Sequence, residues 1–130
     1  MGSAQDAAAI RAGYQAFASG DLAAVGELLS PDIRWHMPGH SPLAGTYDGL
    51  PDVVQYLTTL MQMTGGTYGV DVQDVLASDD HVVALVREHG QREGATLDAP
   101  EAHVWRMRDG RAAEFWAYRA DSDAVDAFWS

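Results

Sequence analysis

The residues with the widest chemical range in this 130-residue sequence are its five histidines, because imidazole titrates near neutral pH and serves as base, acid or metal ligand. His81 and His89 fall on one face of an expected strand, but eight residues at about 3.3 Å each separate them by about 26 Å. His36 and His40 are four residues apart, yet a Pro-Gly pair between them prevents the helical geometry of a zinc motif. We therefore expect neither a metal nor a cofactor.

His103 is the first candidate for proton transfer. It shares an expected strand face with Trp105 and Met107. An imidazole beside an indole and a thioether in an apolar pocket is favoured in its neutral form, which suits a general base or a hydrogen-bond donor. The alternative is a core histidine that is bonded to a backbone carbonyl.

His36 is the second candidate, and its position sets a condition. Ile33, Trp35 and Met37 alternate along the chain with Arg34 and His36. Neighbouring residues of a strand point to opposite faces, so His36 and Trp35 cannot both face a pocket.

Tyr14, in an expected helix, carries a hydroxyl that can donate to a developing oxyanion; the alternative is a core tyrosine with its tip in water. Other residues are expected to bind the ligand as the pocket wall. They are Phe17, Trp35, Met37, Tyr56, Leu60, Glu88, Trp105, Phe115 and Arg119.

The elements that position these residues fall into two groups. Apolar spacing predicts helices in residues 6–29, capped by Asp6 and broken at 19–21, and from Pro51 to residue 63. A turn-rich loop is expected over 38–49. Strands are predicted over 33–37, 68–76, 81–93, 101–108 and 111–119, with a short last helix after Asp121.

This order, with helices first and a meander of strands after them, indicates an α+β fold in a single domain, residues 1–130. A bent antiparallel sheet wrapped by three helices leaves a cone-shaped pocket between the helices and its concave face. We expect function to lie in that pocket.

The last strand also predicts a partner. Trp116 and Tyr118 alternate with Phe115, Ala117 and Arg119. If the latter set faces the pocket, two large aromatic side chains lie on the outer face of the sheet, which predicts a homodimer through that face. The opposite parity, with the aromatics inside, is the alternative.

Charge and composition exclude other classes. Eight Lys and Arg residues stand against 19 Asp and Glu, a formal charge of −11, and such an acidic surface repels nucleic acid. There is no cysteine, and the longest apolar run is far shorter than the roughly 20 residues that cross a bilayer. We expect a cytoplasmic protein with no membrane or nucleic-acid partner.

Several segments together resemble the SnoaL-like branch of the nuclear transport factor 2 and ketosteroid isomerase superfamily. The resemblance covers nearly the whole chain and implies the cone-shaped α+β barrel. It is carried by Tyr14, Ala16, Phe17, Gly20, Asp21 and Leu22, by Leu28, Leu29, Pro31, Asp32, Trp35, His36, Pro38 and Gly39, by Leu43, Ala44, Gly45, Tyr47 and Gly49, and by His103, Val104, Trp105, Arg106, Asp109, Gly110, Phe128 and Trp129.

The residues that the resemblance would make functional differ in type. The base of ketosteroid isomerases, an Asp before a proline, falls on Met37, and their oxyanion tyrosine falls on Gly13, one residue before Tyr14. Their second oxyanion acid falls on His103. The last-strand Asp of polyketide cyclases has no counterpart in residues 111–119.

We predict a cofactor-free enzyme that isomerises, cyclises or dehydrates a small hydrophobic substrate, such as a polyketide- or steroid-like compound. His103 or His36 would transfer the proton and Tyr14 would donate a hydrogen bond. The alternative is a protein of the same fold that binds a small ligand without catalysis.

Overall fold

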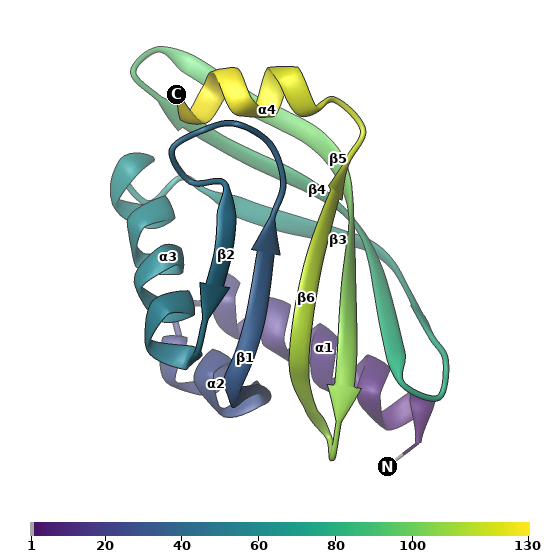
Figure 1. Cartoon of the computed structure of the whole chain (residues 1–130). Coiled ribbons are helices and arrows are strands. Elements are labelled where there is room, and N and C mark those ends of the chain that lie inside the picture. Colours follow the sequence, from purple (N-terminus) through teal and green to yellow (C-terminus); the bar gives the residue numbers. More distant parts are fainter. Residues whose placement is uncertain (1) are drawn as a thin grey trace.

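The computed structural model describes residues 2–130 and contains four helices and six strands (Figure 1). In chain order they are α1 (Ser3–Ala18), α2 (Leu22–Leu28), β1 (Leu29–Met37), β2 (Gly45–Asp48), α3 (Leu50–Met63), β3 (Gly69–Ala77), β4 (His81–Arg92), β5 (Ala95–Arg108), β6 (Arg111–Arg119) and α4 (Ser122–Trp129).

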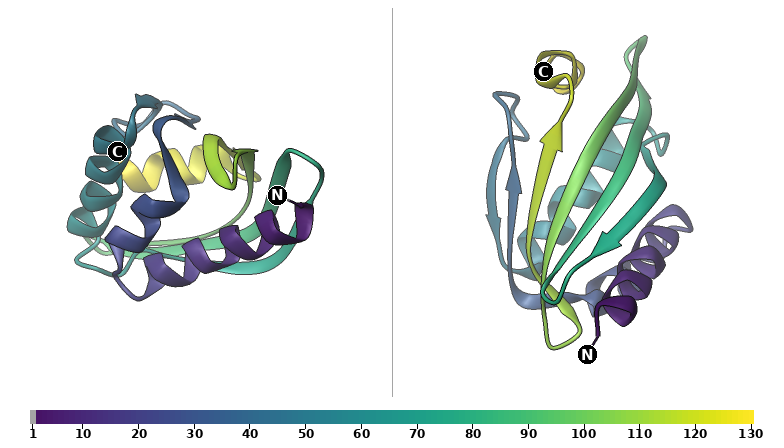
Figure 2. Two further views of the ribbon diagram at one scale, coloured as in Figure 1. Left: turned by 90° about the horizontal axis from the view of Figure 1, so that it is seen from below. Right: turned by 90° about the vertical axis from the view of Figure 1, so that its right-hand side faces the viewer.

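All six strands form one strongly curved sheet in the order β2-β1-β6-β5-β4-β3. Every neighbouring pair is antiparallel except β1 and β6, which are parallel. Helix α1 packs against β3 and β4, and α3 packs against β1 and β2, so the helices cover the concave face (Figure 2). The α+β class and the curved sheet wrapped by helices are as predicted.

The helices begin and end close to their predicted positions. Asp21 and Asp121 accept hydrogen bonds from Ala24 N and Ala124 N at the starts of α2 and α4. Helix α1 begins earlier than predicted, at Ser3, and Asp6 lies buried in its first turn instead of capping it.

Three strands differ from the prediction: β1 begins at Leu29 instead of residue 33, β5 begins six residues before its predicted start, and β2 was not predicted. Strand β5 begins at Ala95 because Glu93 and Gly94 both adopt positive φ, 50° and 81°, and form a two-residue hairpin turn. Strand β2 lies inside the predicted loop. It pairs with β1 through main-chain bonds, and its short length hides any alternation of apolar residues.

The direction of each strand face is now clear. Ile33 and Trp35 of β1 and Phe115 and Ala117 of β6 are buried on the concave side, whereas Tyr118 is 58% exposed on the outer side. This is the parity that places the aromatic pair Trp116 and Tyr118 outside. None of the helices in residues 2–130 combines the length and apolarity needed to cross a membrane.

Candidate active site

A cavity of about 70 Å³ lies between α1, α3 and the concave face of the sheet. On the scale where about 10–15 Å³ holds one water, it has room for several waters or a small organic molecule. Ten predicted site residues line it: Tyr14, Phe17, Trp35, Met37, Tyr56, Leu60, Glu88, His103, Trp105 and Phe115. The wall is apolar, built of aromatic and aliphatic side chains, and its polar groups are few and clustered.

The cluster begins with three side chains whose hydrogen bonds fix one another's direction. Trp105 Nε1 donates to the hydroxyl oxygen of Tyr14 at 3.1 Å. That oxygen lies 2.7 Å from Nδ1 of His103. Because indole N–H can only donate, the hydroxyl of Tyr14 accepts from Trp105 and gives its own hydrogen to His103 Nδ1.

The other nitrogen of His103 continues the chain. Nε2 lies 2.9 Å from Oε1 of Glu101, whose side chain is fully buried. Since Nδ1 accepts, Nε2 carries the hydrogen and donates it to the carboxylate. Tyr14, His103 and Glu101 thus form a continuous relay from the cavity into the sheet, comparable in its logic to a nucleophile, a base and an orienting carboxylate.

Burial sets the protonation of this relay. Desolvation lowers the pKa of His103 to about 4, against an opposing effect of the charge on Glu88, so the imidazole is neutral at pH 7. Desolvation also raises the pKa of Tyr14, so its phenol stays protonated. At neutral pH the hydroxyl of Tyr14 and Nε2 of His103 therefore each carry a hydrogen, and both side chains are uncharged.

Glu88, on β4, supplies a carboxyl group of a different kind. Its Oε1 accepts a 2.7 Å hydrogen bond from the hydroxyl of Tyr68, and the residue is only 3% exposed. Burial, and then its hydrogen bond and charge interaction with Glu101, raise the pKa of Glu88 to about 8. At neutral pH Glu88 is largely a neutral acid facing an apolar cavity.

Glu88 and Glu101 each hold one buried carboxyl oxygen without a hydrogen-bond partner in the described part of the chain. Glu88 Oε2 and Glu101 Oε2 are both buried and receive no hydrogen bond from any N–H or hydroxyl group of residues 2–130. Burial raises the pKa of both groups, and for Glu101 the interactions with Glu88 and with the Arg119 guanidinium oppose that rise. A proton held by Glu88 and donated to Glu101 would satisfy both oxygens at once. The pair is then one acid and one carboxylate.

Arg119 was predicted to contact the ligand, but it does not line the cavity. Its Nε lies 3.4 Å from Oε2 of Glu101, behind that carboxylate, and its side chain is 4% exposed. Its NH1 donates to the carbonyl of Pro38 and to Asp126. Of the two directions left open for Arg119, the structure shows the inward one, and its contact there is with Glu101 and not with the cavity.

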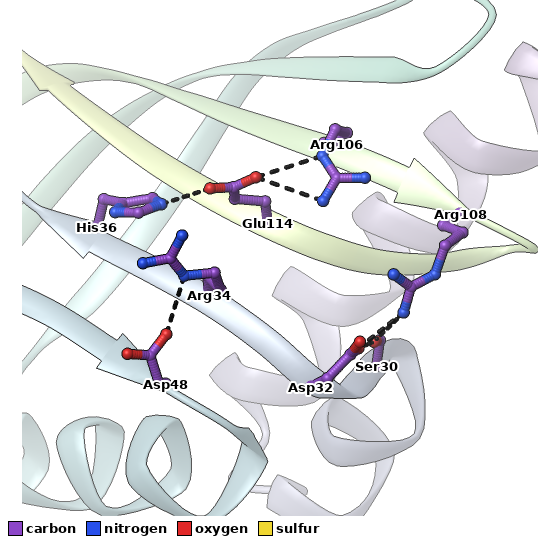
Figure 3. Close-up of polar contacts among 8 residues, drawn as sticks. All are labelled: Ser30, Asp32, Arg34, His36, Asp48, Arg106, Arg108 and Glu114. Carbon is purple, nitrogen blue, oxygen red and sulfur yellow. Dashed lines mark hydrogen bonds and ion pairs between the residues drawn. The ribbon is translucent and has the colours of Figure 1, made fainter.

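His36 was predicted as a proton-transfer residue, and the structure places it outside the cavity. Trp35 takes the inward position, so the alternation of the strand turns His36 to the outer face. There its Nε2 lies 2.6 Å from Glu114 (Figure 3). Its ring also stacks on Trp116. The assignment of His36 to the pocket is therefore wrong.

The outer face around His36 carries a row of ion pairs (Figure 3). Arg106 also contacts Glu114, at 3.3 Å, and Arg34 donates to Asp48 at 2.9 Å. Hydrogen bonds from His36 and Arg106 lower the pKa of Glu114. These groups satisfy one another at the surface, and none of them reaches the cavity.

Sequence reasoning missed Glu101 and Tyr68. The signal for Glu101 was present, because it precedes His103 by two residues and so shares its strand face. Tyr68 lies just before β3, where alternation gives no direction. Within residues 2–130, no group of three or more His, Asp or Glu side chains converges as a metal site would require.

The profile of the SnoaL-like domain matches residues 10–115. The chain belongs to the SnoaL-like family. This SnoaL-like protein is 34% identical to the protein Rv0034 of Mycobacterium tuberculosis over 93% of both chains. Its structure is similar to Bal32a from a soil-derived mobile gene cassette, with 33% identity, 98% of each chain covered and a TM-score of 0.96.

Two further structures extend the comparison. A protein with a cystatin-like fold from Xanthomonas campestris is 31% identical and has a TM-score of 0.92. The alignment covers 100% of the SnoaL-like chain and 99% of the Xanthomonas chain. IdmH of Streptomyces antibioticus, a polyketide cyclase candidate, is 25% identical over 94% of both chains, with a TM-score of 0.76. The predicted family and the predicted fold are both confirmed.

Proposed function

We propose that this protein is a cofactor-free acid–base enzyme that isomerises, cyclises or dehydrates a small, neutral, hydrophobic substrate. The relay from Tyr14 through His103 to Glu101, with the acid Glu88 beside it in the cavity, carries the proposal. Resemblance to IdmH supports a polyketide-like substrate, and the apolar wall suits other hydrophobic ring compounds, such as steroid-like ones.

The relay removes a proton from the substrate. The hydroxyl oxygen of Tyr14 accepts the substrate's proton while its own hydrogen passes to Nδ1 of His103. The imidazolium that forms lies 2.9 Å from the carboxylate of Glu101, which stabilises the new positive charge. One proton leaves the substrate and one arrives on His103.

Glu88 returns a proton at another atom of the substrate. Because it is neutral around pH 7, it can donate to an oxygen on which negative charge develops. The imidazolium of His103 then releases its extra proton and the Glu88 carboxylate takes one up, so that both groups return to their starting states. An acid and a base with separate environments in one cavity are what a proton shift within a single substrate needs.

The charge of the cavity favours a neutral substrate. Among residues 2–130 no Lys or Arg lines it, and the nearest guanidinium, that of Arg119, is already engaged by Glu101 and Asp126. An anionic ligand would therefore lie beside Glu101 without a free counter-charge, at a large desolvation cost.

One observation favours the alternative, a binding protein without catalysis. Both nitrogens of His103 and the hydroxyl of Tyr14 are already bonded within the protein. A ligand held by the apolar wall alone would leave those bonds unbroken.

Hydrogen–deuterium exchange separates the two functions. Cyclohexanone and 2-tetralone, neutral ketones with acidic C–H groups, would be incubated with the protein in deuterium oxide and followed by proton NMR. We expect protein-dependent exchange next to the carbonyl, and its loss in His103→Ala. Binding of either ketone without exchange would instead establish the binding function.

A further inference from the structure

Arg119 is buried but does not reach the cavity, and it contacts three groups at once. Its Nε lies 3.4 Å from Glu101 Oε2, and its NH1 lies 3.2 Å from Asp126 Oδ1 and 3.1 Å from the carbonyl oxygen of Pro38. The directed hydrogen bonds go outward, to Asp126 and Pro38. The contact with Glu101 is an ion pair without hydrogen-bond geometry, since Nε has no hydrogen-bond partner.

The outward contacts form what we call the clasp: Arg119, Asp126 of α4 and residues 38–41. Asp126 accepts hydrogen bonds from His40 N at 2.9 Å and Ser41 N at 3.3 Å. These bonds lower the pKa of Asp126, which keeps it ionised beside Arg119. The clasp thus holds a buried cation at a fixed distance from the relay.

The position of that cation distinguishes the two cavity carboxyls. Glu101 touches Arg119, whereas Glu88 receives only the phenol of Tyr68. Of two acids that share one proton, the one nearer the cation is the easier to ionise.

We propose that Arg119 is a positioning residue: held by the clasp, it keeps the negative charge on Glu101, so that Glu88 keeps the shared proton. This inference rests on the proposed function, because it explains which carboxyl is the acid and which orients His103. It also makes α4 and residues 38–41, which lie outside the cavity, part of the machinery that sets the proton position.

The other titratable groups around Glu101 do not replace this role. His103 of β5 donates to Glu101 but is neutral, and Glu88 of β4 is its rival for the proton. Tyr56 of α3 and Tyr68 before β3 are buried phenols whose pKa values are raised by burial, so they carry no charge. Arg119 is the cation that the structure places against the pair.

The test follows the carboxyl carbons of Glu88 and Glu101 by NMR across pH in the full chain labelled with ¹³C-glutamate. Glu88→Gln and Glu101→Gln assign the two signals. In the wild type, Glu101 should ionise at lower pH than Glu88. Arg119→Gln should move the ionisation of Glu101 to higher pH and reverse or merge this order, and Arg119→Lys should restore it.

Asp126→Asn provides the opposite change. The side-chain oxygen of Asn still accepts hydrogen bonds, so Arg119 stays in place while the outer negative charge is lost. The charge of Arg119 then acts on Glu101 alone, and the ionisation of Glu101 should move to lower pH. If Arg119→Gln does not fold, this variant decides by itself: a downward move supports the proposal and an unchanged titration overturns it.

Equal effects of Arg119→Gln and Arg119→Lys would show a purely structural role and overturn the proposal, as would an unchanged titration in Arg119→Gln. Because the titration needs no substrate, its outcome is independent of the ketone exchange. A wild type that titrates as expected but exchanges no ketone would contradict the enzymatic function and leave the role of Arg119 standing.

Discussion

Nε2 of His103 lies 2.9 Å from a carboxylate oxygen of Glu101, two residues before it on the same strand. This contact fixes the tautomer of His103, because Nε2 must carry the hydrogen and Nδ1 must accept the hydroxyl of Tyr14. The contact between Glu101 and His103 therefore determines which nitrogen of His103 can accept a proton from Tyr14.

The relay predicts a large difference between two histidines. His103→Ala should lower ketone exchange by about 100-fold or more, the scale of a lost general base. His36→Ala should leave exchange unchanged, because His36 lies on the outer face with Glu114. Exchange would be measured for both variants at equal concentrations of folded protein, and an equal loss in both would contradict the assignment.

The acid Glu88 predicts the pH dependence of exchange. His103 must be neutral, so activity should fall as pH drops toward about 4. Glu88 must be protonated, so activity should also fall as pH rises through about 8. A profile of exchange rate against pH should be bell-shaped, and Glu88→Gln should lose the alkaline limb.

The same group predicts how stability changes with pH. The pKa of Glu88 is about 8 in the folded chain against an ordinary 4.5, so between these values only the unfolded state releases the proton. The free energy of unfolding should therefore fall as pH rises from about 6.5 to 8, by at most about 1.4 kcal/mol per pH unit. Below pH 6.5, protonation of unfolded His103 opposes this slope.

Urea denaturation at several pH values measures that slope. Glu88→Gln should flatten it between pH 6.5 and 8, whereas Glu27→Gln, at an exposed helix position, should keep it. Parallel curves for the wild type and Glu88→Gln would show that Glu88 is ionised in the folded protein.

Gly39 predicts how much the clasp stabilises the fold. It has a φ of 99°, and a Cβ there would lie 2.8 Å from Arg119 NH1 and even closer to Asp126. Gly45 has a φ of 132° with nothing within 4 Å of such a Cβ. Gly39→Ala should therefore cost about 1–3 kcal/mol of unfolding free energy beyond Gly45→Ala, which carries backbone strain alone. Equal losses of unfolding free energy in the two variants would mean that Arg119 and Asp126 can move away from the new methyl group without destabilising the fold.

The outer face of the sheet remains the predicted homodimer surface. Leu76, Leu85 and Tyr118 are 52%, 41% and 58% exposed there, on β3, β4 and β6. If a second copy covers this face, light scattering should give twice the monomer mass, and Leu85→Arg should give the monomer. Thr96→Arg, at an exposed position near the β4–β5 turn, should leave the mass unchanged.

Much of the fold followed from local signals. An Asp-Gly pair favours a tight hairpin turn, and residues 109–110 form the β5–β6 turn, where Asp109 has a φ of 53° and Gly110 one of 79°. Glycine is costly inside a helix, and at Gly13 it allows a close neighbour, because a Cβ there would lie 2.5 Å from Leu28. Glu93 and Gly94 carried a weaker signal of the same kind, and the start of β5 was missed.

The sequence by itself determined the order of the elements apart from β2, the family and the apolar character of the pocket, because alternation and turn residues act over a few positions. It left open which strand faces point inward, since alternation fixes relative and not absolute direction. The tertiary structure determined that Trp35, and not His36, points into the cavity. It also brought Tyr14, Glu88 and Arg119, from three other elements, to Glu101 and His103 of β5. The protonation state of Glu88 also depends on the tertiary structure. A carboxyl group stays protonated at neutral pH only when other parts of the chain bury it and place a second carboxyl group beside it.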